Sequence, residues 1–257
     1  GGVKPNPRAN LVYEGIQIEK KKKVDFILPV GGGSVIDTAK AISLGAADSE
    51  GGDFFDFYLR KRKPTAALKV GVVLTIPAAG SESSTSTVIE KTIGGQVIKC
   101  GCSSELNRPL FAILDPELTF TVSRYQTACG VTDMMAHIME RYFTNSDGVD
   151  VTDNICEGLL RAIIKNALTV MEDPHNYNAR ANLMWAGSLA HNNICGVDRE
   201  QDWATHHLEH QLSALYDVAH GAGLAVMFPA WMEYVFKHDV MRFARFASEI
   251  FNVPFDF

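Results

Sequence analysis

The feature that most constrains the fold lies at residues 202–221, DWATHHLEHQLSALYDVAHG. This stretch holds four of the chain's eight histidines, namely His206, His207, His210 and His220. His206 and His210 are four residues apart, so on a helix they share one face. On a straight helix His220 would lie roughly 21 Å beyond His206, whereas the ligand atoms of one metal ion each lie about 2 Å from it. If His206 and His220 meet at one centre, the helix must therefore end between them.

The sequence offers an end for that helix at Tyr216 and Asp217. An aspartate side chain readily N-caps a helix, and here the next helix would begin at residues 218–220. We therefore predict a helix, a sharp turn at Asp217, and a second helix whose first turn presents His220.

A second segment, GVTDMMAHIMER at 130–141, places Asp133 and His137 four residues apart in an amphipathic helical pattern. A carboxylate and an imidazole at this spacing can converge on one ion. The candidate ligands of a metal site are thus Asp133, His137, one or more of His206, His207 and His210, and His220. The chemistry of the residues leaves an alternative open, in which both segments are the polar faces of solvated helices.

The composition of the 257-residue chain is that of a globular protein, with 46% hydrophobic and 21% charged residues. A net charge of −6 disfavours nucleic acid as a partner, because such binding depends on phosphate neutralisation. No apolar stretch approaches the ~20 residues that span a bilayer, and no signal peptide is recognisable. Five irregularly spaced cysteines do not suggest a disulfide framework. These features predict a cytoplasmic protein without membrane contact.

The first half of the chain alternates apolar strand patterns with helical patterns, which predicts a parallel α/β sheet. The predicted strands are 24–30, 70–77 and 110–114, and the predicted helices are 9–23 and 35–47. A glycine turn, GGGS at 31–34, joins the first strand to a helix, the arrangement in which helix N–H groups can meet a phosphate. The alternative is a tight turn without a ligand.

From about residue 119 the pattern becomes helical throughout. The predicted helices are 125–144, 151–172, 178–195, 203–216, 218–236 and 240–251. We therefore predict two domains, an α/β domain at 1–118 and a helical domain at 119–257. The turn-rich opening and the uncapped end lead us to expect that the sequence is a piece of a longer protein.

Seven stretches, taken together, resemble the iron-containing (group III) alcohol dehydrogenases, and most closely the butanol dehydrogenase branch. They are VKPNP at 3–7, GGGSVIDTAKAI at 31–42, LTIPAAGSESS at 74–84, AILDPEL at 112–118, GVTDMMAHIMERY at 130–142, QDWATHHLEHQLSALYDVAHG at 201–221 and LAVMFPAWMEY at 224–234. They run in the family's order and cover nearly the whole chain. The resemblance implies the dehydroquinate synthase-like fold of this family, with a parallel-sheet dinucleotide-binding domain, a helical metal-binding domain and an active site between them.

The resemblance also implies roles for individual residues. The metal ligands would be Asp133, His137, His206 and His220, and the histidine beside the nicotinamide and substrate would be His210. His207 has no counterpart. The cofactor-binding residues would be Gly32, Gly33, Ser34, Asp37, Thr75, Ser81, Ser84 and Lys99. The second cofactor-binding loop, at 78–84, reads AAGSESS here, whereas many family members have TAGTGSE. The side chains available to contact the cofactor from this loop therefore differ from those of the family.

The implied function is reversible hydride transfer between a primary alcohol or aldehyde and NAD or NADP, in a homodimer. Three imidazoles and a carboxylate suit Fe²⁺ or Zn²⁺. Compared with the family, we expect the given sequence to lack the first strand–helix units, which contact the adenosine ribose, and the last helices. The resemblance therefore implies NAD or NADP, without preference for either. Two alternatives are a dehydroquinate synthase-like lyase and a truncated, non-catalytic metal-binding remnant.

Overall fold

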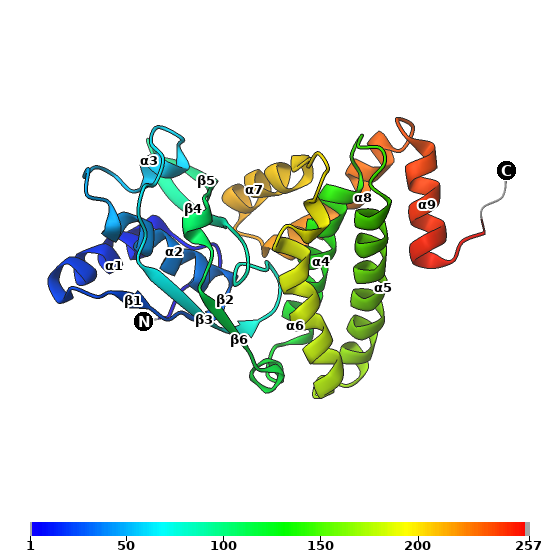
Figure 1. Cartoon of the computed structure of the whole chain (residues 1–257), viewed down its shortest axis with the longest axis horizontal. Helices are drawn as coiled ribbons and strands as arrows, with labels where there is room; N and C mark the ends of the chain where they lie inside the picture. Colours follow the sequence, from blue (N-terminus) through cyan, green and yellow to red (C-terminus); the bar gives the residue numbers. More distant parts are fainter. Residues whose placement is uncertain (1, 255–257) are drawn as a thin grey trace.

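The computed structural model describes residues 2–254. Its α/β part is built on a parallel sheet with β3 (Lys69–Ile76) in the middle (Figure 1). Both β2 (Val30–Gly32) and β6 (Phe111–Leu114) pair with residues 73 and 74 of β3, so they lie on its opposite edges. The short β1 (Phe26–Ile27) pairs with the beginning of β3. Parallel strands were predicted for this part of the chain, and the structure confirms them.

One strand prediction is wrong in detail. Residues 24–30 do not form one buried strand, because Pro29 separates β1 from β2 and has no N–H to donate to a ladder. The side chains of Leu28 and Val30 are 49% and 59% exposed, whereas Val72 in the central strand is fully buried. Position in the sheet, rather than apolar character alone, decides which of these side chains is buried.

Two helices cover the sheet on one side of the α/β part. Helix α2 (Gly33–Ala47) packs on the strands, and α1 (Ala9–Lys22) packs on α2. Their close approach depends on a small residue, since a Cβ atom at Gly45 would lie 2.4 Å from Cδ1 of Ile16. The short helix α3 (Phe55–Tyr58) adds an aromatic cluster to the same core.

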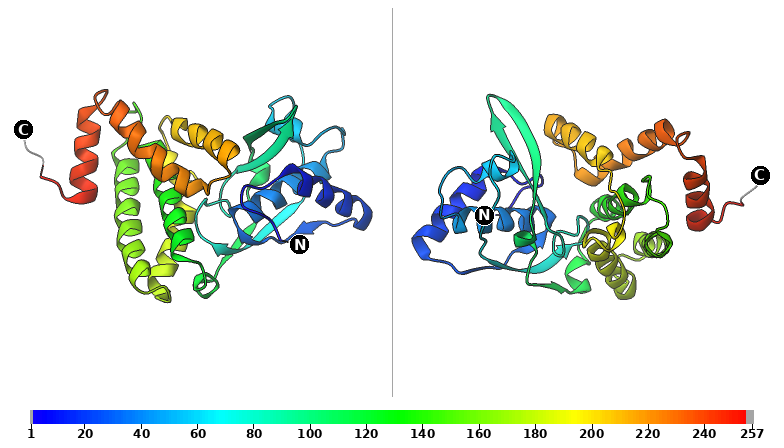
Figure 2. Two further views of the ribbon diagram at one scale, coloured as in Figure 1. Left: turned by 180° about the vertical axis from the view of Figure 1, so that it is seen from behind. Right: turned by 45° about the horizontal axis from the view of Figure 1, so that its top comes forward.

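A β-hairpin that we did not predict follows β3. Its strands β4 (Ser86–Ile93) and β5 (Gln96–Ser103) are antiparallel and are joined by Gly94 and Gly95, which have φ angles of 59° and 83°. Positive φ at both positions is typical of the two-residue turns that match the twist of a hairpin. The hairpin lies next to helix α7 (Ala204–Tyr216) of the helical part (Figure 2).

The helical part is arranged around α4 (Arg124–Tyr142), which packs against α5, α6 and α8. The other helices are α5 (Asp150–Glu172), α6 (Tyr177–His191), α7 (Ala204–Tyr216), α8 (His220–Val235) and α9 (Val240–Phe251). The short 3-10 helices of residues 2–254 are η1 (Glu105–Asn107), η2 (Pro116–Thr119) and η3 (Ile194–Gly196). Ile138, Tyr142, Leu160 and Ile163 are fully buried between α4 and α5, and they form the centre of this second core.

The chain thus has a parallel-sheet part followed by a helical part, as the sequence predicted. The division into domains near residue 118 falls close to η2 and stays a prediction. Among residues 2–254, no helix is long and apolar enough to cross a membrane.

Candidate metal centre

Two of the predicted ligands come from one buried face of α4. Asp133 and His137 are one turn apart, and each is no more than 5% exposed. Nδ1 of His137 lies 3.4 Å from Oδ1 of Asp133. Helix α4 itself lies close to the α/β part, because a Cβ atom at Gly130 would be 2.4 Å from the carbonyl oxygen of Pro77. This contact holds the ligand-bearing face beside the end of β3.

The other two predicted ligands are brought together by the turn between α7 and α8. Helix α7 ends at Tyr216, and Asp217 adopts the left-handed conformation with φ of 52°. The prediction that Asp217 N-caps the next helix is therefore wrong. Asp217 is instead the C-cap of α7, and its carboxylate accepts hydrogen bonds from Asn6 Nδ2 at 3.1 Å and Arg8 Nη2 at 3.2 Å.

The turn at Asp217 nevertheless brings His220 back to His206, as predicted. His220 is the first residue of α8, and its ring lies 5.3 Å from that of His206, centroid to centroid. The next residue, Gly221, is pressed against α4, since a Cβ atom there would lie 2.0 Å from the carbonyl oxygen of Cys129. A glycine at this position lets the start of α8, and with it His220, reach α4.

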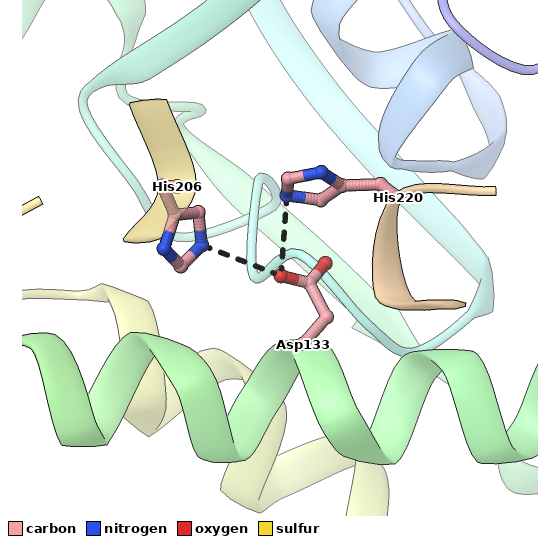
Figure 3. Close-up of side chains that lie close together, drawn as sticks. All are labelled: Asp133, His206 and His220. Atoms are coloured by element: carbon pink, nitrogen blue, oxygen red, sulfur yellow. Dashed lines mark ion pairs between the residues drawn. The ribbon is translucent and has the colours of Figure 1, made fainter. Parts of the chain in front are cut away.

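Three side chains from three helices converge on one point (Figure 3). Oδ1 of Asp133 lies 3.7 Å from Nε2 of His206 and 3.6 Å from Nε2 of His220. The ligand atoms of all three residues lie within 4.8 Å of one another. Within residues 2–254, Asp133 Oδ1 and His206 Nε2 are buried without a hydrogen-bond partner. Buried polar atoms are rarely left unpaired, so this arrangement fits a bound cation.

His137 lies beside this group of three and is not a member of it. Its Nδ1 atom is also buried without a partner among the described residues. Its ring lies 4.7 Å from that of His206 and 4.0 Å from that of His191, which we did not single out in the sequence. Burial, followed by the neighbouring histidines, holds the pKa of His137 well below its usual value, so the ring is neutral, as a metal ligand must be.

Carboxylates lie behind the two histidines of the converging group. Glu140 accepts a 2.8 Å hydrogen bond from Nδ1 of His206, and Glu209 accepts one from Nδ1 of His220. Burial opposes the imidazolium form of His206, but the nearby carboxylates of Asp133 and Glu140 outweigh it and raise its pKa to about 8. Sequence reasoning missed both glutamates, although Glu209 lies one helical turn after His206.

A second group of three potential ligands is Glu209, His210 and His220. Here a positively charged side chain takes the place of an ion, because Nζ of Lys99 lies 3.9 Å from Oε2 of Glu209. Both oxygens of Glu209 also accept hydrogen bonds, from Ser213 and His220. This group is thus compensated without an ion, unlike the one around Asp133.

His210 lies next to the converging group, with its ring 5.5 Å from that of His220. Burial, then the charges of His220 and Lys99, lower its pKa to about 2, so its imidazole is neutral. His207 is exposed on the same helix.

A cavity of about 1970 Å³ connects this centre with the glycine turn. Gly32 N-caps α2 and Gly33 is its first residue, so these glycines and Ser34 bring the helix N-terminus to the cavity wall. Gly32 packs closely on the end of β3, where its Cβ would lie 3.0 Å from Cβ of Ile76. The geometry fits an anionic group at the N-terminus of α2.

The other predicted cofactor residues differ in their surroundings. Asp37, Ser81, Ser84 and Lys99 line the cavity, whereas Thr75 in β3 does not. Ser81 donates a 2.5 Å hydrogen bond to Asp37, whose pKa is raised by burial.

Lys40, fully buried on α2, donates to the carbonyl oxygens of Ser81 at 2.6 Å, Ser84 at 3.1 Å and Ser86 at 3.0 Å. Asp37 and Lys40 therefore attach the loop at 78–84, AAGSESS, to α2. Among the side chains of the loop, the hydroxyl of Ser81 takes part in this attachment through its bond to Asp37.

Comparison with known proteins agrees with the fold. The model of the iron-containing alcohol dehydrogenases matches residues 1–116, and that of the C-terminal part of the Fe-containing alcohol dehydrogenase family matches residues 127–254. The chain belongs to the iron-containing alcohol dehydrogenase family.

Its relatives include butanol dehydrogenases and an aldehyde reductase. The chain is 42% identical to NADH-dependent butanol dehydrogenase A of Clostridium acetobutylicum, covering 98% of this chain and 63% of the relative. It is 37% identical to the NADPH-dependent aldehyde reductase YqhD of Escherichia coli, covering 98% and 65%. The crystal structure of an NADH-dependent butanol dehydrogenase A from Thermotoga maritima superposes with a TM-score of 0.95 at 43% identity, covering 100% and 63%. The chain thus spans less than two thirds of the length of these relatives.

Proposed function

We propose that the protein catalyses reversible hydride transfer between a primary alcohol of about butanol size, or its aldehyde, and a nicotinamide cofactor. The observation that carries this proposal is the converging group of Asp133, His206 and His220, with its unpaired buried atoms, at one end of the cavity that reaches the glycine turn. The names of the relatives support the substrate class and the cofactor class.

Each residue in the proposed site has a separate task. Asp133, His206 and His220, together with His137, would hold Fe²⁺ or Zn²⁺, because imidazole and carboxylate suit both ions. The N-terminus of α2 would hold the pyrophosphate of NAD or NADP. When bound, the ion supplies Lewis acidity toward the substrate oxygen and the nicotinamide supplies the hydride chemistry.

His210 would handle the proton of the substrate hydroxyl. Its imidazole is neutral and lines the same cavity as the converging group, so it can orient the substrate hydroxyl by a hydrogen bond, or relay its proton by taking up a proton on one ring nitrogen while releasing one from the other. We further propose a cytoplasmic homodimer with domains at 1–118 and 119–257.

Nicotinamide absorbance tests the proposal directly. Butanal and NADH or NADPH, added to the chain loaded anaerobically with Fe²⁺ or Zn²⁺, should give a steady loss of the absorbance of the reduced cofactor. A lyase of the dehydroquinate synthase type would turn over without net change in this absorbance. If the chain binds metal and cofactor but the absorbance stays constant with a series of short aldehydes, the proposed function is wrong.

A further inference from the structure

The first observation concerns the environment of Glu140. This residue is on α4, one turn beyond His137, and is 1% exposed. Its Oε1 atom accepts two hydrogen bonds from His206, one from the backbone N–H at 2.9 Å and one from Nδ1 at 2.8 Å. In the part of the chain that the structure describes, the only charged side chain within 4 Å of this carboxylate is His206. Glu140 therefore fixes both the backbone and the ring of one predicted ligand.

The second observation is a parallel arrangement at Glu209. This residue is on α7 and is fully buried. Its Oε2 atom accepts a hydrogen bond from Nδ1 of His220, and its Oε1 atom accepts one from the hydroxyl of Ser213. The charge of Glu209, unlike that of Glu140, is compensated by Lys99, which in turn donates a 3.0 Å hydrogen bond to Asn6.

Both arrangements determine where the ring hydrogen of the histidine lies. An ionised carboxylate can only accept hydrogen bonds, so Nδ1 of His206 and of His220 must carry the hydrogen. In the neutral ring, Nε2 then carries the lone pair, and both Nε2 atoms face Oδ1 of Asp133. With the hydrogen on Nε2 instead, each ring would donate to Asp133 and occupy the place where an ion would bind.

We propose that Glu140 and Glu209 are positioning residues of the metal centre, which hold His206 and His220 with Nε2 free for the ion. This inference rests on the proposed function, because it assigns these carboxylates to the same metal site. Partners of this kind orient metal-bound histidines in many proteins, and their loss typically weakens metal binding by about 10- to 100-fold. Within residues 2–254 no Lys or Arg side chain pairs with Glu140, whereas Lys99 offsets the charge of Glu209, so the charge of Glu140 contributes more to the site.

Titration of the metal-free chain with Co²⁺ tests the proposal. Glu140→Gln and Glu209→Gln keep the side-chain shape and remove the charge, so each should raise the dissociation constant by about 10- to 100-fold, with the larger effect at Glu140. Glu233→Gln is the matched control, because Glu233 is an exposed carboxylate on α8, the helix that carries His220. The Co²⁺ dissociation constant of the Glu233→Gln variant should stay within about twofold of that of the unaltered chain.

The outcomes separate this inference from the proposed function. If the unaltered chain binds Co²⁺ and both glutamine variants bind it within about threefold as tightly, the positioning role is wrong and the metal site stands. If the unaltered chain binds no Co²⁺, the metal site and the positioning role both fail.

A second measurement needs no substitution and therefore does not depend on a variant that folds. Nitrogen-15 spectra of the metal-free chain, recorded where both rings are neutral, should show the hydrogen of His206 and His220 on Nδ1. Finding it on Nε2 in both rings would overturn the inference.

Discussion

Oδ1 of Asp133 and Nε2 of His206 lie 3.7 Å apart, and neither has a hydrogen-bond partner within residues 2–254. Both side chains are at least nine-tenths buried, and they come from helices that are distant in the sequence. Burying such atoms unpaired costs about 1–3 kcal/mol each, and more for a charged group. A cation between them would satisfy both atoms, and this relationship is the basis of the proposed metal centre.

Gly221 should be indispensable to the approach of α8 to α4. Gly221→Ala places a Cβ atom 2.0 Å from the backbone of Cys129, which cannot yield as a side-chain end would. We expect the free energy of unfolding to fall by about 3 kcal/mol, the upper range for overpacking, as measured in urea. Gly158→Ala is the control, because that helical site has no atom within 4 Å and the change should stabilise the chain slightly. Equal stability of the two variants would contradict the packing described for Gly221.

Lys40 should give the stability a characteristic pH dependence. Burial lowers its pKa to about 8, from an ordinary value of 10.5. Between these pH values the unfolded chain binds more protons than the folded chain, so Lys40 makes the free energy of unfolding rise with pH, by at most about 1.4 kcal/mol per pH unit.

Chemical unfolding at several pH values tests this expectation. The stability of the unaltered chain relative to Lys40→Met should increase from about pH 8 to 10.5, whereas its stability relative to the exposed-site variant Lys165→Met should not change. A difference between the unaltered chain and Lys40→Met that is constant with pH would show that Lys40 keeps its proton.

His210 should act in the reaction without holding the metal. His210→Gln is expected to lower kcat by about 100-fold or more, the range for removal of a general acid–base group. The metal content should remain that of the unaltered chain, because the ring lies outside the group formed by Asp133, His206 and His220. Loss of the metal together with the activity would instead make His210 a ligand.

The sequence predicted those parts of the fold that have strong local patterns. The helices that carry Asp133 and His206 have clear helical spacing, and the need to bring His220 back to His206 predicted the turn between α7 and α8. The manner in which α7 ends was not predictable from Asp217 alone. Its left-handed conformation is accompanied by bonds from Asn6 and Arg8, more than 200 positions earlier in the chain.

The β4–β5 hairpin was missed despite a usable signal. Gly94 and Gly95 stand between two β-rich runs, and two glycines in that position favour a two-residue hairpin turn. The small and hydroxyl-bearing residues at 78–84 are typical of a cofactor-binding loop, but the chain enters a strand at Ser86, soon after them. The partners of the histidines, Glu140 and Glu209, could not be assigned because an acidic residue on a helix is usually solvated, and only the packing of α4, α7 and α8 shows that these two are buried.

The metal content of the chain tests the central claim most directly. Elemental analysis of anaerobically purified protein should find about one Fe²⁺ or Zn²⁺ per chain, and none in His206→Ala or His220→Ala. His238→Ala should keep the metal, because His238 is exposed and its side chain bonds only to Asn145 among the described residues. If His206→Ala and His220→Ala both retain the metal of the unaltered protein, then the metal is not bound by the four proposed ligands, Asp133, His137, His206 and His220.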